Sequence, residues 1–121
     1  MSYDLAVWEG PRPDGAAAAA AEFARRVAEM DRLYEAGEPM TEPTAAIRTF
    51  VAAAEERYPE DDADPDSSVW AVWPLIGNAV GDGIFIPMTY PGARAARDAV
   101  AGIAAAHGLV CFDPQSEELL T

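Results

Sequence analysis

The chain has 121 residues, half of them hydrophobic, and its 21 acidic residues outnumber its 8 arginines to give a formal net charge of −13. This length and apolar content predict one folded domain over residues 1–121, whereas the negative charge excludes nucleic acid and membranes as direct partners. The single cysteine excludes an internal disulfide, and the first ten residues lack the regions of a signal peptide, so we expect a cytoplasmic protein.

A strand followed by a long helix is predicted at the start of the chain. Residues 3–9 (YDLAVWE) are rich in strand-forming residues and are closed by a Gly-Pro pair. The helix is expected over residues 15–36, because Asp14 provides an N-cap and Gly37 provides a stop. Its apolar residues recur every three or four positions, which predicts a stripe that packs on the core: Phe23, Val27, Met30 and Tyr34.

A second helix and an acidic segment follow. The helix is expected over residues 43–58, with Thr41 as its cap and Pro59 as its end. Residues 59–68 (PEDDADPDSS) then form an acidic spacer within the domain, and its carboxylates are Glu60, Asp61, Asp62, Asp64 and Asp66. Charge runs of this kind are commonly solvated loops, but next to large aromatic side chains they are also a surface that a basic protein binds.

Three strands and a helix complete the predicted elements. Residues 69–75 (VWAVWPL) and 84–89 predict strands, and Pro87 limits the second of them. A helix is expected over residues 93–107 and a last strand over 109–113. The order β-α-α-β-β-α-β predicts an α+β ferredoxin-like plait, in which the helices lie on one face of a four-stranded antiparallel sheet.

The sheet face that such a fold leaves open would carry tryptophan. Side chains alternate along a strand, so at least one of Trp8, Trp70 and Trp73 is expected to point away from the helices. Exposed contiguous apolar surface usually marks an interaction site. The C-terminal tail, the acidic spacer and a second copy of the chain are alternative covers for this face.

The residue types that carry catalysis or bind metals form no recognisable set. His107, the only histidine, ends a helix and is expected to cap its free carbonyls. Cys111 lies in a strand between apolar neighbours, which predicts an inert buried thiol. Asp62, Asp64 and Asp66 have the spacing of a calcium loop, but the glycine and the glutamate that the loop requires are missing. We therefore expect no enzyme and no bound cofactor or metal.

The two ends of the chain resemble a group of short uncharacterised bacterial proteins, mainly from actinomycetes. Their first motif is a Tyr-Asp-Leu strand that runs into an aromatic residue and an acid, here Tyr3, Asp4, Leu5, Trp8 and Glu9. Their second motif is His-Gly-Leu-Val-x-aromatic-Asp-Pro, here residues 107–114, and the resemblance extends to residues 44–50 and to the acidic spacer. Small acidic proteins of this type resemble immunity proteins, which neutralise a toxin by occluding it.

Charge, spacer and tryptophans together predict a non-catalytic interaction module, immunity-like in type, that binds a cationic protein partner or a second copy of itself as a homodimer. The carboxylates of the spacer would steer the partner, and the tryptophans would anchor it: Trp70, Trp73 and Trp8. The alternative is a small-molecule-binding or enzymatic ferredoxin-like domain. Its pocket would lie on the open sheet face and be lined by Trp8, Trp73, Met88 and Tyr90.

Overall fold

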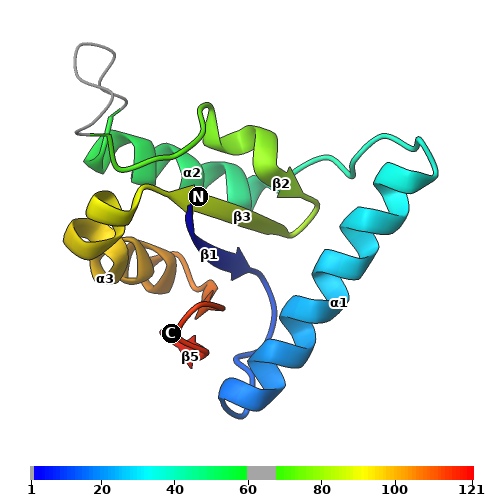
Figure 1. Cartoon of the computed structure of the whole chain (residues 1–121), viewed down its shortest axis with the longest axis horizontal. Helices are drawn as coiled ribbons and strands as arrows, with labels where there is room; N and C mark the ends of the chain where they lie inside the picture. Colours follow the sequence, from blue (N-terminus) through cyan, green and yellow to red (C-terminus); the bar gives the residue numbers. More distant parts are fainter. Residues whose placement is uncertain (1, 60–67) are drawn as a thin grey trace.

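The computed structural model describes residues 2–59 and 68–121. Three helices, one 3₁₀ helix and five strands follow one another along the described chain (Figure 1): β1 (Tyr3–Trp8), α1 (Ala16–Glu35), α2 (Ala45–Arg57), η2 (Leu75–Asn78), β2 (Ala79–Val80), β3 (Gly83–Met88), α3 (Tyr90–Ala106), β4 (Val110–Asp113) and β5 (Glu118–Leu119). The predicted α+β class is confirmed, and the three helices lie close to their predicted bounds.

The sheet is open and antiparallel throughout, with the strand order β2-β3-β1-β4-β5. β1 is its central strand, and Tyr3 lies opposite Met88 of β3. The predicted count of four strands is wrong, because the chain turns back after β4 and adds β5, with Leu119 opposite Phe112. This last strand is only two residues long and has no alternating pattern by which it could be predicted.

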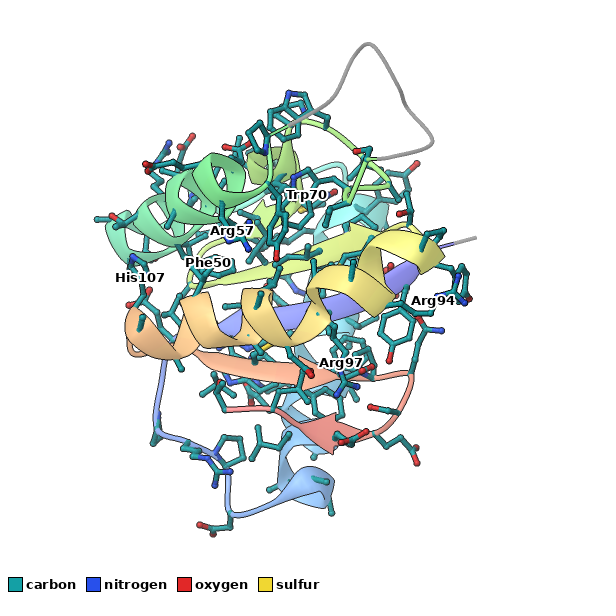
Figure 2. The ribbon with its side chains drawn as sticks, turned by 90° about the vertical axis from the view of Figure 1, so that its left-hand side faces the viewer. Phe50, Arg57, Trp70, Arg94, Arg97 and His107 are labelled. Carbon is teal, nitrogen blue, oxygen red and sulfur yellow. The ribbon has the colours of Figure 1, made fainter. Side chains whose placement is uncertain are left out.

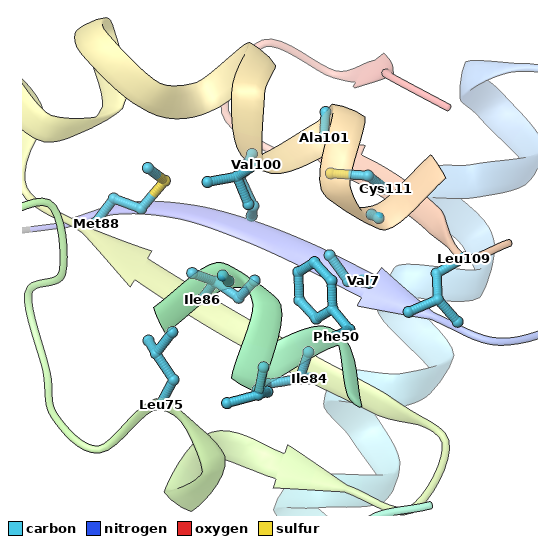
Figure 3. Packing of buried hydrophobic residues seen from close by; sticks show 14 of the residues in the cluster. Val7, Phe50, Leu75, Ile84, Ile86, Met88, Val100, Ala101, Leu109 and Cys111 are labelled. Carbon is cyan, nitrogen blue, oxygen red and sulfur yellow. The ribbon is translucent and has the colours of Figure 1, made fainter. Parts of the chain in front are cut away.

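Helices α2 and α3 cover one face of the sheet and enclose the main core (Figure 2). Alternate residues of the central strands point to this side, among them Val7 of β1 and Ile86 of β3. They meet buried side chains of the helices and of the neighbouring segments, which Figure 3 shows packed together: Phe50, Leu75, Met88, Val100, Leu109 and Cys111. Complete burial of a large apolar side chain contributes about 1.5–3 kcal/mol, so this cluster dominates the stability of the domain.

Helix α1 lies on the opposite face of the sheet, which corrects the prediction that all helices share one face (Figure 1). The side chains of β1 and β4 that point away from the main core form a second cluster with the first half of α1: Ala6, Trp8, Ala19, Phe23, Val110 and Phe112. This face has no polar alternation and therefore needs a cover. The alanine-rich start of α1 supplies it, because small side chains let the helix approach the sheet closely.

Residues 69–75 do not form the predicted strand. Trp70 makes one isolated bridge to Met88, and the chain then leaves the sheet and enters η2, where Leu75 is fully buried. Pro74 has no N–H to donate to a strand ladder, which favours this early departure. Residues 69–75 are thus partly buried, as their apolar composition suggests, but they pack over the sheet as a loop. The strand that pairs with the outer edge of β3 is the short β2.

The helix starts differ from the predictions in their capping residues. Thr44 caps α2 in place of Thr41, and its Oγ1 accepts a hydrogen bond from the third residue of that helix. Asp14 does not cap α1, because the N-cap position belongs to Gly15, which has no side-chain hydrogen bond to offer. An uncapped start is consistent with a helix that owes its stability to packing on the sheet.

Helix α3 is held tightly at both ends. Thr89 caps its start and accepts a hydrogen bond of 2.9 Å from the N–H of Gly92. A Cβ at Gly92 would lie 2.7 Å from the Cα of Val69, so only glycine fits between the helix and that segment. At the other end His107 Nδ1 lies 2.9 Å from the carbonyl oxygen of Ile103, which confirms the predicted capping role of this histidine.

Candidate functional site

The second half of α1 carries its apolar stripe beyond the sheet. Phe23 packs edge to face on Phe85 of β3, with ring centroids 5.8 Å apart. Further along, Val27 and Met30 are half-buried and belong to neither apolar cluster, and Tyr34 is 79% exposed. The prediction that the whole stripe packs on the core is therefore wrong beyond Phe23, because the helix runs obliquely away from the sheet (Figure 1).

A groove of about 360 Å³ lies between this stripe and the sheet. Its apolar walls come from α1, from β3 and from the loop after α1, and we call it the α1 groove: Phe23, Val27, Met30, Met40, Phe85 and Pro87. Two methionines line it, and methionine adapts its shape to different apolar partners. The groove therefore has the character of a binding surface for an apolar side chain or a helix face.

Polar groups lie around these apolar walls. Asn78 lines the groove, and its Nδ2 is buried without a hydrogen-bond partner among the described residues. Asp4 lines it as well, and helical spacing puts the exposed Asp31 and Glu35 along one side of the stripe on α1. An apolar floor with carboxylates beside it fits a segment that carries apolar and cationic residues together.

The residues predicted to bind a partner are placed very differently from one another. The five carboxylates of the acidic spacer lie outside the described residues: Glu60, Asp61, Asp62, Asp64 and Asp66. Trp70 is buried and donates from Nε1 to the carbonyl oxygen of Tyr58 at 2.7 Å. Trp8 does point away from α2 and α3, but α1 covers it and leaves it 2% exposed. Among the tryptophans only Trp73, at 40% exposure, offers a surface to a partner.

The pocket predicted under the alternative function is not assembled. Trp8 and Met88 belong to the two clusters on opposite faces of the sheet, so they cannot line one cavity. Met88 is fully buried in the main core, and Tyr90 lies at the first position of α3 with its ring edge to face on Tyr3. A ligand site on the sheet would therefore need other residues.

A buried carboxylate that was not predicted joins three elements. Asp113, at the end of β4, is fully buried, and its Oδ2 accepts hydrogen bonds from the hydroxyl of Tyr3 at 2.5 Å and from Nη1 of Arg97 at 2.9 Å. Its Oδ1 accepts the backbone N–H groups of Gln115 and Ser116. Burial opposes ionisation, but these hydrogen bonds outweigh it, so the pKa of Asp113 is lowered.

This arrangement ties β1 and α3 to the turn between β4 and β5. The hydrogen bond to Asp113 raises the pKa of Tyr3, so its hydroxyl stays protonated and acts as a donor. All four contacts of the carboxylate are made within the chain, which leaves it no acceptor capacity for a substrate. The cluster is therefore structural, and a strand-end Asp before a turn is the signal that could have suggested it.

The thiol of Cys111 is inert. Its side chain is fully buried, and burial together with the negative charge of Asp113 raises the pKa of Cys111 to about 12. The prediction of a buried, unactivated cysteine is confirmed.

The described residues contain no group of three or more His, Cys, Asp or Glu side chains arranged to hold a metal ion. Within the same residues no helix has the length and apolar character needed to cross a lipid bilayer. Comparison of the chain with protein-family models, with curated proteins and with solved structures gave no match.

Proposed function

We propose that this chain is a non-catalytic interaction module that binds a cationic, amphipathic segment of a protein partner in the α1 groove. The observation that carries the proposal is the stripe of α1, whose Val27, Met30 and Tyr34 lie outside both apolar clusters of the domain. An apolar helix face without a partner in its own domain is a common feature of surfaces that bind another chain.

The charge of the chain supports a cationic partner. Its net charge is −13, and within the described residues five arginines are in ion pairs with carboxylates of the chain: Arg25, Arg26, Arg32, Arg48 and Arg97. A second copy of the chain would bring Asp31 and Glu35 against another acidic surface, so charge complementarity favours a basic protein over a homodimer. In this proposal the acidic spacer steers the encounter, and Trp73 extends the contact.

This activity is that of an immunity-like inhibitor, which occludes a basic site by binding to it, and we propose that it acts in the cytoplasm. We further infer a ferredoxin-like plait with two departures. The strand order β4-β1-β3-β2 and the crossovers through α2 and α3 are those of a plait, whereas β5 and the position of α1 are additions. Of these two additions, α1 forms a wall of the α1 groove.

The test uses a synthetic amphipathic helix of leucine and lysine as the probe, and a leucine–glutamate helix as its counterpart. We expect the lysine peptide to bind and Met30→Gln to weaken its binding at least about tenfold, because central apolar contacts dominate such interfaces. Calorimetry measures the affinity. Ala28→Gln is the matched control, because it introduces the same residue at an exposed position of α1 and leaves the net charge unchanged.

Three results would contradict the proposal. The first is equal binding of the peptide by the Met30→Gln and Ala28→Gln variants, which would show non-specific attraction between opposite charges. The second is binding of the glutamate peptide as tight as that of the lysine peptide. The third is self-association of the wild-type chain that disappears in Met30→Gln, seen by sedimentation, because a second copy would then be the occupant.

The roles of the spacer and of Trp73 are tested with the same peptide. Neutralisation of the five spacer carboxylates to amides is expected to slow association and to flatten its salt dependence, while dissociation stays nearly unchanged. Trp73→Ala is expected to increase the dissociation rate. If neither variant differs from the wild type at low salt, the acidic spacer and Trp73 take no part in binding.

A further inference from the structure

A second cavity, of about 370 Å³, lies beside another flank of α1. It is partly open and is lined by α1, by the turn between β2 and β3 and by the segment that leads into α2, and Arg26 of the helix is among its lining residues. The charged residues that line the cavity besides Arg26 are Arg25, Glu29, Glu42 and Asp82, and Trp8 lines it as well. The residues that hold the guanidinium of Arg26 indicate what else this cavity could bind.

The guanidinium of Arg26 is held on three sides. Its Cζ lies 5.4 Å from the ring centroid of Trp8, which is a cation–π contact. Its Nη1 donates to Oδ1 of Asp82 at 2.8 Å, and its Nε donates to Oε1 of Glu22 at 2.8 Å. The arginine side chain is only 13% exposed, so these contacts are made largely away from solvent.

A glycine makes room for this guanidinium. Gly83 lies opposite Trp8 in the sheet, and a Cβ at this position would be 2.6 Å from Nη1 of Arg26. Any larger residue would push the guanidinium away from the indole and from Asp82. We call this arrangement of Trp8, Glu22, Asp82 and Gly83 the cradle.

The cradle suits a guanidinium better than an ammonium ion. A guanidinium is planar, stacks on an aromatic face and donates at fixed angles to two carboxylates at once. An ammonium is a compact and strongly hydrated point charge, so it gains less from an indole face in a partly closed site. The selectivity follows from shape, because both cations carry the same charge.

We propose that the cradle is a guanidinium-selective site that Arg26 fills in the free chain and that an arginine side chain of a protein partner enters through the cavity in exchange for it. Glu29 and Glu42 also line the cavity, but they pair with Arg32 and Arg48, so the attraction of an incoming cation comes from the overall charge of −13. This site goes beyond the α1 groove, because it selects arginine over lysine and does not depend on apolar contacts with Met30.

The selectivity is tested by chemical rescue of the Arg26→Ala variant. We expect this variant to melt below the wild type, and ethylguanidinium at tens of millimolar to raise its melting temperature by about 3–5 °C through binding to the vacated cradle. Ethylammonium at the same concentration is expected to raise it by less than a third of that amount. Arg32→Ala is the matched control, because it removes an exposed ion pair from the same helix, and neither cation should rescue it.

An equal increase in melting temperature with both cations would overturn the selectivity, and so would no increase with either. If Arg26→Ala does not fold, Arg26→Met is used with the guanidinium ion itself, since methionine keeps the apolar stem of the side chain. For that variant too, equal stabilisation by guanidinium and ammonium, or stabilisation by neither, would overturn the selectivity.

The exchange is tested on the wild-type chain with amphipathic peptides of leucine and arginine or of leucine and lysine. We expect the arginine peptide to bind at least about fivefold more tightly, and Asp82→Asn to abolish this difference while the lysine peptide keeps its affinity. A contrary outcome combines two results: ethylguanidinium rescues Arg26→Ala, but the wild-type chain binds the arginine and lysine peptides equally well. It would show that Arg26 always occupies the cradle, and it would overturn the proposed exchange. Because Met30→Gln tests the groove separately, the two proposals can fail independently.

Discussion

Replacement of Asp113 by asparagine should be one of the most destabilising isosteric changes in the chain. The carboxylate is fully buried and accepts hydrogen bonds from Tyr3 and Arg97 on Oδ2 and from two backbone N–H groups on Oδ1. Asparagine keeps the contacts of Oδ1 but turns an amide donor toward Tyr3 and Arg97. Loss of one partner of a buried ion pair costs about 3–5 kcal/mol.

The expected cost is smaller than that, because Arg97 is 25% exposed and also pairs with Asp98. We therefore expect about 2–3 kcal/mol of lost stability at neutral pH, or a fall of about 10 °C in melting temperature. Urea unfolding followed by circular dichroism measures it. Asp98→Asn is the control, because Asp98 contacts the same arginine from an exposed position and should change stability by less than about 0.5 kcal/mol.

The pH dependence of this difference has a definite sign. The folded-state pKa of Asp113 is lowered, so its stabilisation is complete above the unfolded-state value of about 3.9 and is lost as the pH falls through the folded-state pKa. The gap between wild type and Asp113→Asn should be constant from about pH 5 to 8 and shrink below about pH 4. Equal stability at pH 7, or a gap that widens in acid, would refute the reasoning.

Three further predictions concern packing. Gly92→Ala should lower the free energy of unfolding by at least about 2 kcal/mol, because the new Cβ would meet the backbone of Val69. Gly102→Ala on the same helix has open space and should raise the free energy of unfolding by about 0.5–1 kcal/mol, and thermal melts compare the two variants. Because Trp70 is buried and Trp73 is exposed, Trp70→Ala should lower the free energy of unfolding by about 3–5 kcal/mol and Trp73→Ala by less than about 1 kcal/mol, as measured by urea titration. Equal losses of stability would contradict this difference in burial. Cys111 should react with a thiol reagent at pH 8 at least about a hundredfold more slowly when folded than in urea, and fast labelling would contradict its raised pKa.

The helices were predictable because each has a local signal. Periodic apolar residues, a proline or glycine at the ends and long uninterrupted segments define α1, α2 and α3, and the strands at β1, β3 and β4 lie between such signals. The placement of α1 on the second face of the sheet had no local signal. It depends on which face lacks a cover after folding, and this is decided by contacts such as that of Phe23 with Phe85.

The candidate sites were harder to predict for the same reason. Composition indicated a surface for a cationic partner, but the tryptophans named as anchors include two that the fold buries, Trp8 and Trp70. An aromatic residue in an apolar run is ambiguous between core and interface until its neighbours are known. The α1 groove was hidden in a stripe that has ideal core spacing, and only the oblique direction of the helix separates Met30 from the core.

The central position of β1 has a consequence for how the protein is made. β1 is synthesised before the other strands of its sheet, yet both of its neighbours, β3 and β4, follow it by more than 70 residues. The nascent chain must therefore expose an apolar strand, with free backbone groups on both edges, until residue 83 has been synthesised. Such long-range pairing slows folding, so we expect the sheet to form only after β3 and β4 have been synthesised, and the acidic residues that precede them keep the unfolded chain soluble until then.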